Sequence, residues 1–582
     1  MLDLIFLWHM HQPDYREHPG GTLESSFALP WVYLHAIKDY TDMAAHLERH
    51  PQIRAVVNFV PVLLEQIEDY VAQFDTGDFR DPLLRILATP SLDHLDHLDH
   101  EARSDLLKAC FRSNHTTMLA PFPGYQRLLD LYREITRHGD AALAYLSGAY
   151  FSDLITWYHL AWTGESVRRS QPLIAALMSK GEGYTLADRQ ALLALIGETL
   201  RQIIPRYRAL AERGQIELSC TPQTHPLAPL LLDFGVAHET LPDAPLPRTP
   251  VYPGGRSRVD VQIEAARASH TQRFGVPPMG MWPAEGAVSH AFVEQLATHG
   301  CRWIASGEGV LRATLHKTGQ DGSRAAYRPW QLDGANGLTL FFRDERLSDM
   351  IGFEYAKWYG QDAARHFVGE LEAILATTPA DERAVVSIIM DGENAWEHYP
   401  YNAYYFFEEL YSQLEKHPQI RTTTYSTLLD QPLAPASLPG LVAGSWVFGT
   451  LSTWIGDADK NRAWDLLCAA KQSYDLVMAS GRLDAQAQAA ASAQLAICES
   501  SDWFWWFGDY NPAPAVASFD QLFRRNLASL YRCLQLTPPQ QLDVAISTGV
   551  PEGASTRSDT SNTNTTSNAG GTMRRAQETP PS

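Results

Sequence analysis

Short apolar runs recur along the chain, and most of them end in polar or acidic side chains. Each run has the length of a buried strand and is rich in Val, Ile, Phe or Trp. The clearest runs span residues 2–12, 53–61, 214–225, 280–286, 301–309, 338–349 and 384–394, and a weaker one spans 420–429. We therefore predict seven or eight buried strands.

Amphipathic helical patterns lie between most of these runs, for example over residues 261–275, 290–300 and 364–378. Strands and helices in alternation are typical of a parallel sheet whose faces are covered by helices. Seven or eight such units predict an α/β fold in which the sheet closes into a barrel. In parallel barrels the functional side chains gather at the carboxyl ends of the strands. The polar residues that end the runs are therefore expected to share one rim.

The barrel is expected over residues 1–435, with two interruptions. Residues 62–213 are mostly amphipathic and predict a long helical insertion. Residues 230–260 are rich in proline and predict an irregular loop near the rim. Residues 440–540 contain further helical patterns and predict a C-terminal helical domain that completes the cleft. Residues 547–582 have almost no large apolar side chain, so we expect a disordered tail.

Charge narrows the range of partners. The chain has 47 Lys and Arg against 67 Asp and Glu, which gives a net charge of −20. Nucleic acids and anionic membranes need basic patches, so neither is an expected partner. No basic leader opens the chain, and no apolar run approaches the roughly 18 residues that span a bilayer. The six cysteines are scattered without a CxxC pair, which is typical of reduced thiols in a cytoplasmic protein.

Aromatic side chains are abundant, with 15 Trp, 24 Tyr and 22 Phe. They fill cores, but they also stack on the apolar faces of sugar rings. Two acidic residues with a nearby indole end strand-like runs: Glu285 close to Trp282, and Asp391 close to Trp396. Hydrolysis of a glycosidic bond needs two carboxyl groups across the scissile bond. For either residue alone, a helix N-cap is the simpler interpretation.

Three histidines, His9, His11 and His225, also stand at the ends of predicted strands. A neutral imidazole offers a donor and an acceptor, which suits the hydroxyl groups of a sugar. The alternative is a metal site, because His-x-His is a plausible ligand pair and fits a metal-dependent deacetylase. We expect no metal, because the carboxyl pair favours a metal-free site. The His/Asp-rich run at 93–100 has a period of three that spreads its side chains around a helix, so it predicts a solvated surface.

Five stretches, in order along the chain, resemble motifs of glycoside hydrolase family 57, whose members act on α-glucans. They are HMHQP (9–13), GQIELSCTPQTHP (214–226), GMWPAEG (280–286), IIMDGENAWE (388–397) and SDWFWWFGD (501–509). The resemblance covers residues 1–540 and implies a (β/α)7 barrel, a distorted TIM-like fold, followed by helices. It also implies retention of anomeric configuration, with Glu285 as the nucleophile and Asp391 as the general acid/base.

The resemblance further implies where a substrate binds. The expected contacts, beyond the two catalytic carboxyls, are His9, His11, Gln12, Glu217, His225, Trp282, Arg343, Asp349, Glu393, Trp396, Asp502 and Trp505. Glu393 is expected to help hold Asp391 protonated if its carboxylate lies near; a bond that stabilises the loop is the alternative. Packing is the alternative role for Asp502 and Trp505. No cofactor is expected, and the sequence does not define an oligomeric state.

We therefore predict a cytoplasmic retaining hydrolase of starch, glycogen or maltooligosaccharides, of the α-amylase or amylopullulanase type. A 4-α-glucanotransferase is the alternative on the same site, since transfer differs from hydrolysis only in whether a glucan hydroxyl or water reaches the intermediate. Branching is less favoured, because the first and fourth motifs look more like those of amylases. A metal-dependent carbohydrate deacetylase and a non-catalytic glucan-binding protein are alternatives from other classes.

Overall fold

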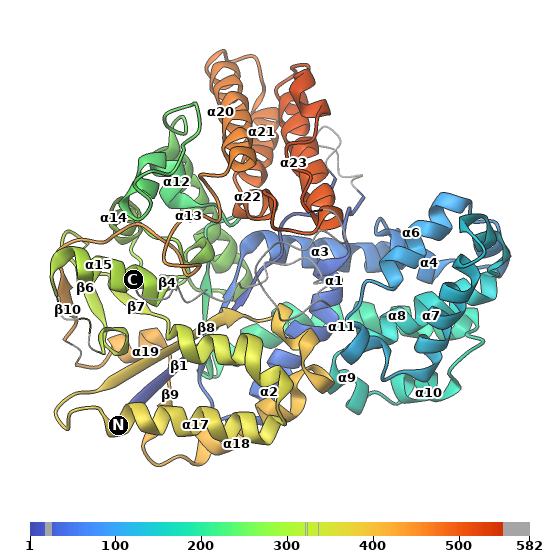
Figure 1. Cartoon of the computed structure of the whole chain (residues 1–582), viewed down its shortest axis with the longest axis horizontal. Helices are drawn as coiled ribbons and strands as arrows, with labels where there is room; N and C mark the ends of the chain where they lie inside the picture. Colours follow the sequence, from blue (N-terminus) through green and yellow to red (C-terminus); the bar gives the residue numbers. More distant parts are fainter. Residues whose placement is uncertain (18–25, 321, 323, 336, 433, 551–582) are drawn as a thin grey trace.

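Figure 1 shows the computed structural model of the chain, which describes residues 1–17, 26–320, 322, 324–335, 337–432 and 434–550. Its centre is a ring of parallel strands ordered β7-β5-β4-β3-β2-β1-β8. These strands are β1 (Leu2–Met10), β2 (Ala55–Phe59), β3 (Ile216–Cys220), β4 (Gly280–Met281), β5 (Trp303–Ser306), β7 (Thr339–Phe342) and β8 (Ala384–Asp391). Every residue of β1 is buried, because helices cover the outside of the ring and side chains fill its inside.

A single bridge closes the ring. Arg343, just after β7, pairs in parallel with Ser387 of β8. The backbone N–H of Asp344 donates to the carbonyl of Ser387 at 2.8 Å. The structure thus confirms a barrel of seven parallel strands, as predicted.

Three short strands extend this ring into a mixed sheet. β6 (Trp330–Leu332) pairs antiparallel with β7, and β10 (Ala436–Leu438) pairs parallel with β6. β9 (Ile420–Thr422) comes from the weak eighth run and pairs with the first residues of β1. It therefore lies at the amino-terminal end of the barrel and outside the ring.

The helices that connect the strands confirm the predicted alternation. α13 (Gly255–Phe274), α14 (His290–Thr298) and α17 (Gly360–Ala376) coincide with the three helical patterns in the sequence. α15 (Glu308–Thr318) and α18 (Tyr404–Lys416) were not singled out in advance. α17 and α18 lie side by side along the lower edge of Figure 1, in yellow and orange.

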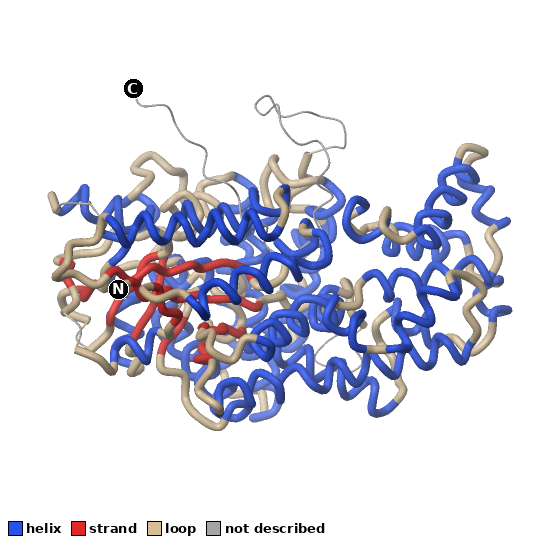
Figure 2. Tube along the Cα trace, turned by 90° about the horizontal axis from the view of Figure 1, so that it is seen from below, coloured by secondary structure: helices blue, strands red, loops and turns tan. Residues whose placement is uncertain are grey.

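All regular structure between β2 and β3 is helical in the described chain, as the pattern over 62–213 predicts. Most of these helices form an arm on the right of Figures 1 and 2, away from the strands. The segments are α3 (Pro61–Thr76), α4 (Pro82–Ala88), α5 (Leu92–Asp96), α6 (His100–Cys110), α7 (Pro123–Thr136), α8 (Gly148–Ala161), α9 (Glu165–Ser170), α10 (Pro172–Lys180) and α11 (Leu186–Glu212). The His/Asp-rich run at 93–100 lies on this arm with its Asp and His side chains exposed, as predicted.

The C-terminal helices stand above the carboxyl ends of the strands (Figure 1). They are α20 (Ala458–Ala479), α21 (Ala485–Cys498), α22 (Ser501–Trp506) and α23 (Ala513–Cys533). The start of α22 is joined to the loop after β3, because the N–H of Ser501 donates to the carbonyl of His225 at 2.8 Å. Val550 forms a bridge with Pro512, and the rest of the predicted tail, 551–582, lies outside the described residues.

Two further sequence expectations concern the chain as a whole. No helix in the described part of the chain is long and apolar enough to cross a bilayer. All six cysteines are described, and none of them forms a disulfide.

Candidate active site

Glu285 lies in a tight turn directly after the two-residue strand β4. Its backbone is left-handed, with φ 59° and ψ 21°, a conformation that costs about 1–3 kcal/mol for a residue with a side chain. Gly286 follows with φ 56°, and a Cβ there would lie 2.7 Å from the Trp282 ring. The predicted strand over 280–286 therefore ends at Met281, and the rest of the run forms a turn that aims one carboxyl into the barrel mouth.

Two donors meet the Glu285 carboxyl. The indole Nε1–H of Trp446 donates to Oε2 at 3.1 Å, and the Ser501 hydroxyl lies 3.3 Å from Oε1. The backbone N–H of Trp446 also donates to the carbonyl of Glu285 at 3.2 Å. Glu285 is only 9% exposed, so these bonds form where water competes little. A carboxylate held in this way is stabilised in its ionised form.

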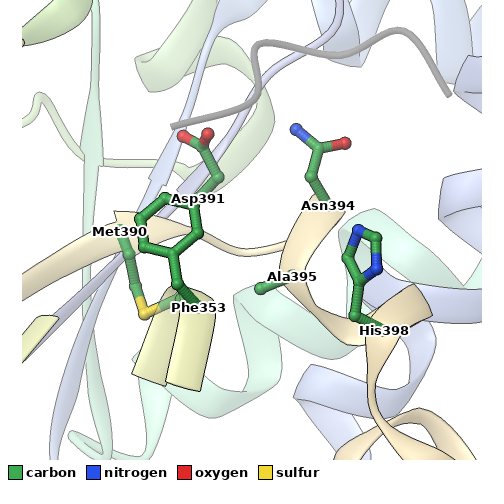
Figure 3. Close-up of a pocket in the computed structure, with 7 residues that line it drawn as sticks. Phe353, Met390, Asp391, Asn394, Ala395 and His398 are labelled. Atoms are coloured by element: carbon green, nitrogen blue, oxygen red, sulfur yellow. The ribbon is translucent and has the colours of Figure 1, made fainter. Parts of the chain in front are cut away.

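Asp391 is the last residue of β8 and pairs in register with His9 of β1. It is partly exposed and lines a cavity. Gly352 and Phe353, which precede β8, form one part of the lining, and Asn394 and other residues that follow β8 form another. Figure 3 shows the Asp391 carboxyl and the Asn394 amide pointing to the same side of this cavity. No hydrogen bond to the Asp391 carboxyl is present within the described residues.

The two carboxyls influence each other's charge. Burial, together with the negative charges of Asp502 and Asp391, raises the pKa of Glu285 to about 8, and the bonds from Trp446 and Ser501 oppose this. Burial also raises the pKa of Asp391 to about 8; the Arg343 guanidinium opposes the rise and Asp502 adds to it. The pair therefore holds at least one proton at neutral pH. The donors at Glu285 favour the negative charge there and the proton on Asp391.

Two histidines form a hydrogen-bonded chain beside Glu285. The ring of His9 donates from Nδ1 to Asn58 Oδ1 at 2.7 Å, and its Nε2 lies 3.2 Å from Nε2 of His225. Nδ1 of His225 lies 2.7 Å from the Ser501 hydroxyl and 4.0 Å from Glu285. Burial and the neighbouring His11 lower the pKa of His9 to about 3 and lower the pKa of His225 as well. Both rings are therefore neutral and offer a donor and an acceptor.

His11 joins the barrel to the C-terminal helices. Its Nε2 lies 2.9 Å from Oδ2 of Asp502 on α22, and its ring stacks on His225 with centroids 3.8 Å apart. His11, His225 and Asp502 also form a group whose ligand atoms lie within 4.8 Å of one another, a spacing that fits a divalent cation. Nε2 of His11 and both ring nitrogens of His225 are hydrogen-bonded inside the protein, whereas Nδ1 of His11 has no hydrogen-bond partner within the described residues.

Glu393 lies behind the site. Its carboxyl accepts hydrogen bonds from the amide of Gln12 at 2.7 Å and from the hydroxyl of Tyr40. Burial and the charge of Asp391 raise the pKa of Glu393 well above its usual range. The charge of Asp391 thus acts on Glu393, but Glu393 is not among the groups that raise the pKa of Asp391. The bonds to Gln12 and Tyr40 agree with the alternative role, in which Glu393 stabilises its loop.

Arg343 and Asp349 form an ion pair at the end of β7. The guanidinium of Arg343 donates to Asp349 at 2.6 Å and to the carbonyl of Ile389 in β8 at 2.7 Å. It also lies over the Trp446 ring, 5.5 Å from its centroid. This pair links the loop that carries Trp446 to the strand that carries Asp391.

A comparison with known protein families identifies the family of this chain. The sequence model of Glycosyl hydrolase family 57 matches residues 5–438, which is most of the chain. The chain belongs to glycosyl hydrolase family 57. The match spans the barrel from within β1 onward and includes Glu285, Asp391 and the three histidines. Membership of this family makes the chain a glycoside-active enzyme. No curated protein sequence matches the chain.

Solved structures with the same fold include enzymes of this family. A GH57 branching enzyme from Thermococcus kodakaraensis has a TM-score of 0.57 and 16% identity, over 91% of this chain and 90% of that one. A GH57-type branching enzyme from Pyrococcus horikoshii has a TM-score of 0.54 and 16% identity, over 91% and 88%. The α-amylase AmyC from Thermotoga maritima has a TM-score of 0.54 and 13% identity, over 92% and 93%. The family 57 chain thus has their fold over nearly its whole described length.

Besides Glu393, four predicted contacts of the family 57 chain are buried in the core or lie at the other end of the barrel. Glu217, early in β3, bonds Trp303 and the backbone of Ser426, which follows β9 at the opposite end of the barrel. Trp396 is buried among core aromatic rings, and its ring centroid lies 5.9 Å from that of Trp8. Trp505 is buried in α22. Trp282 is buried as well, and its ring meets that of Trp446 edge-on at 5.1 Å.

Several side chains that hold the predicted ones in place were not predicted from the sequence. Trp446, 161 residues from Glu285 along the chain, is the most direct of them. It stands in a loop without strand or helix periodicity, so no pattern marks it. Ser501 lies within the motif SDWFWWFGD but is not one of the predicted contacts, and Asn58 lies outside the five motifs. The polarity of Asn58 inside the otherwise apolar stretch 55–60 is the one signal in the sequence.

Proposed function

We propose that the family 57 chain cleaves α-glucans by double displacement, with Glu285 as the nucleophile and Asp391 as the general acid/base. The observation that carries this proposal is a pair of interacting carboxyls at the ends of β4 and β8. Among the described residues, donors bond only one of them, Glu285. Retaining glycosidases need one ionised and one protonated carboxyl in this relation.

The two steps follow from the geometry. Asp391 gives its proton to the glycosidic oxygen while Glu285 attacks the anomeric carbon, so the leaving glucan departs neutral and a glycosyl ester forms. The negative charge of Glu285 is lost in this ester, so Asp391 becomes the more acidic carboxyl and leaves the first step ionised. It then removes a proton from water or from a sugar hydroxyl, which displaces Glu285 and restores the starting configuration.

The neutral rings of His9 and His225 support this assignment. They lie next to Glu285, and their ring nitrogens bond Asn58, each other and Ser501, so that they hold the Ser501 hydroxyl that meets the nucleophile. A positive imidazolium there would stabilise the nucleophile and lower its reactivity, and burial prevents this. His11 and Asp502 close the site from the side of α22.

The substrate class rests on the family and on relatives whose names are branching enzyme and α-amylase. Within that class we propose hydrolysis of the α-amylase or amylopullulanase type. Incubation with maltoheptaose tests it: shorter sugars alone are expected. A ladder of longer sugars indicates transfer, and products that shorten with a debranching enzyme indicate branching. An unchanged substrate contradicts the assignment to α-glucans.

Transfer to a second glucan, as in a 4-α-glucanotransferase, is the second candidate. It is favoured by the low exposure of Glu285, because an enclosed glycosyl ester meets water less often than a bound acceptor. The ratio of longer to shorter products with rising maltoheptaose concentration distinguishes the two, since transfer depends on the acceptor and hydrolysis does not.

The group formed by His11, His225 and Asp502 provides a direct test of the metal-dependent alternative. The proposed mechanism uses no metal, so a strong chelator is expected to leave turnover of maltoheptaose unchanged. Loss of turnover on chelation and recovery with zinc would favour a metal-dependent deacetylase instead.

A further inference from the structure

Four exposed aromatic side chains gather where α17 and α18 begin. They are Trp358, Tyr359, Tyr401 and Tyr405, named here the aromatic patch, and Tyr359 is 85% exposed. Gly360, next to Tyr359, packs against the backbone of Tyr405 so closely that a Cβ there would lie 2.9 Å from it. The rings of Tyr401 and Tyr405 meet edge-on at 5.4 Å. Two separate segments therefore contribute rings to one surface.

The backbone that presents Tyr401 is strained. Tyr401, Asn402 and Ala403 have φ values of 55°, 51° and 60°, three left-handed residues in a row without a glycine. Each costs about 1–3 kcal/mol, and such strain persists at functional sites when the surroundings enforce it. Here the Asn402 side chain accepts from Lys38 and donates to Asp42, each at 2.8 Å. These bonds fix the turn while Tyr401 remains 56% exposed.

Two short segments of the chain connect the candidate active site with the aromatic patch. The cavity beside Asp391 is lined by two segments, residues 352–353 and residues 394–398. The first runs on within five residues to Trp358, and the second runs on within three residues to Tyr401. Figure 3 shows Phe353 and His398 on opposite sides of the cavity, each at the start of one path. Each of these lining segments is thus joined to a patch residue by a few residues of chain.

We propose that the aromatic patch binds a stretch of α-glucan several glucose units away from the bond that is cleaved. The faces of the exposed rings suit the apolar C–H faces of glucose, and the tyrosine hydroxyls suit its polar rim. The guanidinium of Arg169 donates to the Tyr405 hydroxyl at 3.1 Å and is paired with Glu165 at 2.8 Å. With a net charge of −20 on the chain, the patch fits a neutral polymer better than an anionic one.

This inference rests on the proposed function, and a binding measurement separates the two. The full chain is run through native gels with and without amylopectin, and turnover of a chromogenic maltoside is measured in parallel. The variant Tyr359→Ala/Tyr401→Asn removes two rings and keeps a residue that tolerates the left-handed turn. Its apparent affinity for amylopectin is expected to fall by at least about fivefold, the loss of one or two ring contacts. Turnover of the short maltoside is expected to stay within about twofold.

Two controls make the result specific. Tyr145→Ala removes a ring that is 86% exposed on the helical arm, away from the patch, and is expected to leave the affinity for amylopectin unchanged. Tyr359→Ala alone serves if the double variant does not fold, because Tyr359 makes no strained turn; it is expected to weaken binding in the same direction.

The outcomes distinguish the proposals. Retardation by amylopectin that is lost in the patch variant, without turnover of any glucan by the unmodified chain, contradicts the proposed function and supports the patch. Normal turnover with retardation unchanged in the variants overturns the patch. A change in particle mass by light scattering, with retardation unchanged, also overturns it and identifies a contact between two copies of the chain.

Discussion

Glu285 and Asp391 stand at the mouth of the same barrel, but the chain surrounds them differently. Glu285 sits in a left-handed turn, almost fully enclosed, and accepts a hydrogen bond from Trp446. Asp391 ends a regular strand, opens on a cavity and accepts no bond from the described chain. Burial raises the pKa of both carboxyls to about 8, so burial does not distinguish them. The donors do, and they assign the negative charge to Glu285.

The difference also matches the two roles, because the nucleophile needs a carboxyl held in one position and the acid/base needs open space around it. A nucleophile must meet one carbon atom along one direction, so a strained turn and two donors that hold its carboxyl contribute to the rate. An acid/base must serve the leaving oxygen and then the incoming water or hydroxyl, so it needs open space and freedom from competing donors. The predictions below change one side of this comparison at a time.

The largest effect is expected for the carboxyls themselves. Glu285→Gln and Asp391→Asn are each expected to lose about 10³-fold or more of kcat/KM on maltoheptaose, because each removes one of the two groups the reaction needs. With α-maltosyl fluoride, whose leaving group needs no proton, Asp391→Asn is expected to keep a rapid first step and Glu285→Gln is not. Stopped-flow release of fluoride measures this.

Azide sharpens the same comparison. In Asp391→Ala, azide is expected to replace the activated water and yield the α-glycosyl azide, with retention. In Glu285→Ala, azide fills the place of the nucleophile and yields the β-glycosyl azide, with inversion. Product anomers read by NMR therefore assign the two roles, and interchanged anomers would show that the roles are reversed.

Trp446→Phe tests the donor that distinguishes Glu285. It keeps an aromatic ring but removes the Nε1–H bond of 3.1 Å. Loss of a bond to the ionised form raises the pKa of Glu285, and the nucleophile must be ionised, so the acidic limb of the pH–rate profile is expected to move to higher pH. At the optimum, kcat/KM is expected to fall by about tenfold, the value of one hydrogen bond to a charged group.

Trp282→Phe is the matched control for this variant. Trp282 contacts the Trp446 ring, but its own Nε1 has no hydrogen-bond partner within the described chain. Loss of that N–H is expected to leave the acidic limb in place. Equal shifts in both variants would mean that ring packing, and not the donor, sets the pKa of Glu285.

Asp502→Asn changes both carboxyls together. The charge of Asp502 raises the pKa of Glu285 and of Asp391, so its removal lowers both. Activity needs Glu285 ionised, which sets the acidic limb, and Asp391 protonated, which sets the alkaline limb. Both limbs of the profile for kcat/KM are therefore expected to move to lower pH, with a loss of less than about tenfold at the optimum. Movement of only one limb would contradict the conclusion that the charge of Asp502 acts on both carboxyls.

The sequence predicted the barrel because its strands are long enough to show a pattern. β1 supplies nine buried residues in a row, whereas β6 and β10 have three each and were missed. β4 has only two strand residues, so its run was found through apolar composition and misread beyond Met281. Strands of two or three residues are defined by their partners across the sheet, which no local window contains.

The candidate site likewise contains residues that the sequence predicts and residues that it does not. The motif residues Glu285, Asp391, His9, His11 and His225 come together as expected, because ends of parallel strands meet at one rim. Trp446 could not be predicted, since its contact depends on how a loop without periodicity folds over the barrel. Some residues were predicted to contact the substrate only because they lie in a motif. Such residues are as often retained for packing as for chemistry.

Glu217 is the residue where motif and geometry differ most, and Glu217→Gln is expected to have the smallest effect on activity. Its carboxyl bonds the indole of Trp303 at 2.6 Å and the backbone N–H of Ser426 at 2.9 Å, at the barrel end opposite Glu285. An amide cannot accept at both of its heavy atoms, so one buried donor loses its partner at a cost of about 1–3 kcal/mol. The melting temperature is therefore expected to fall by a few degrees while kcat/KM on maltoheptaose, measured well below it, stays within about twofold. A large loss of kcat/KM with an unchanged melting temperature would instead place Glu217 within reach of the substrate and contradict the separation of the two barrel ends.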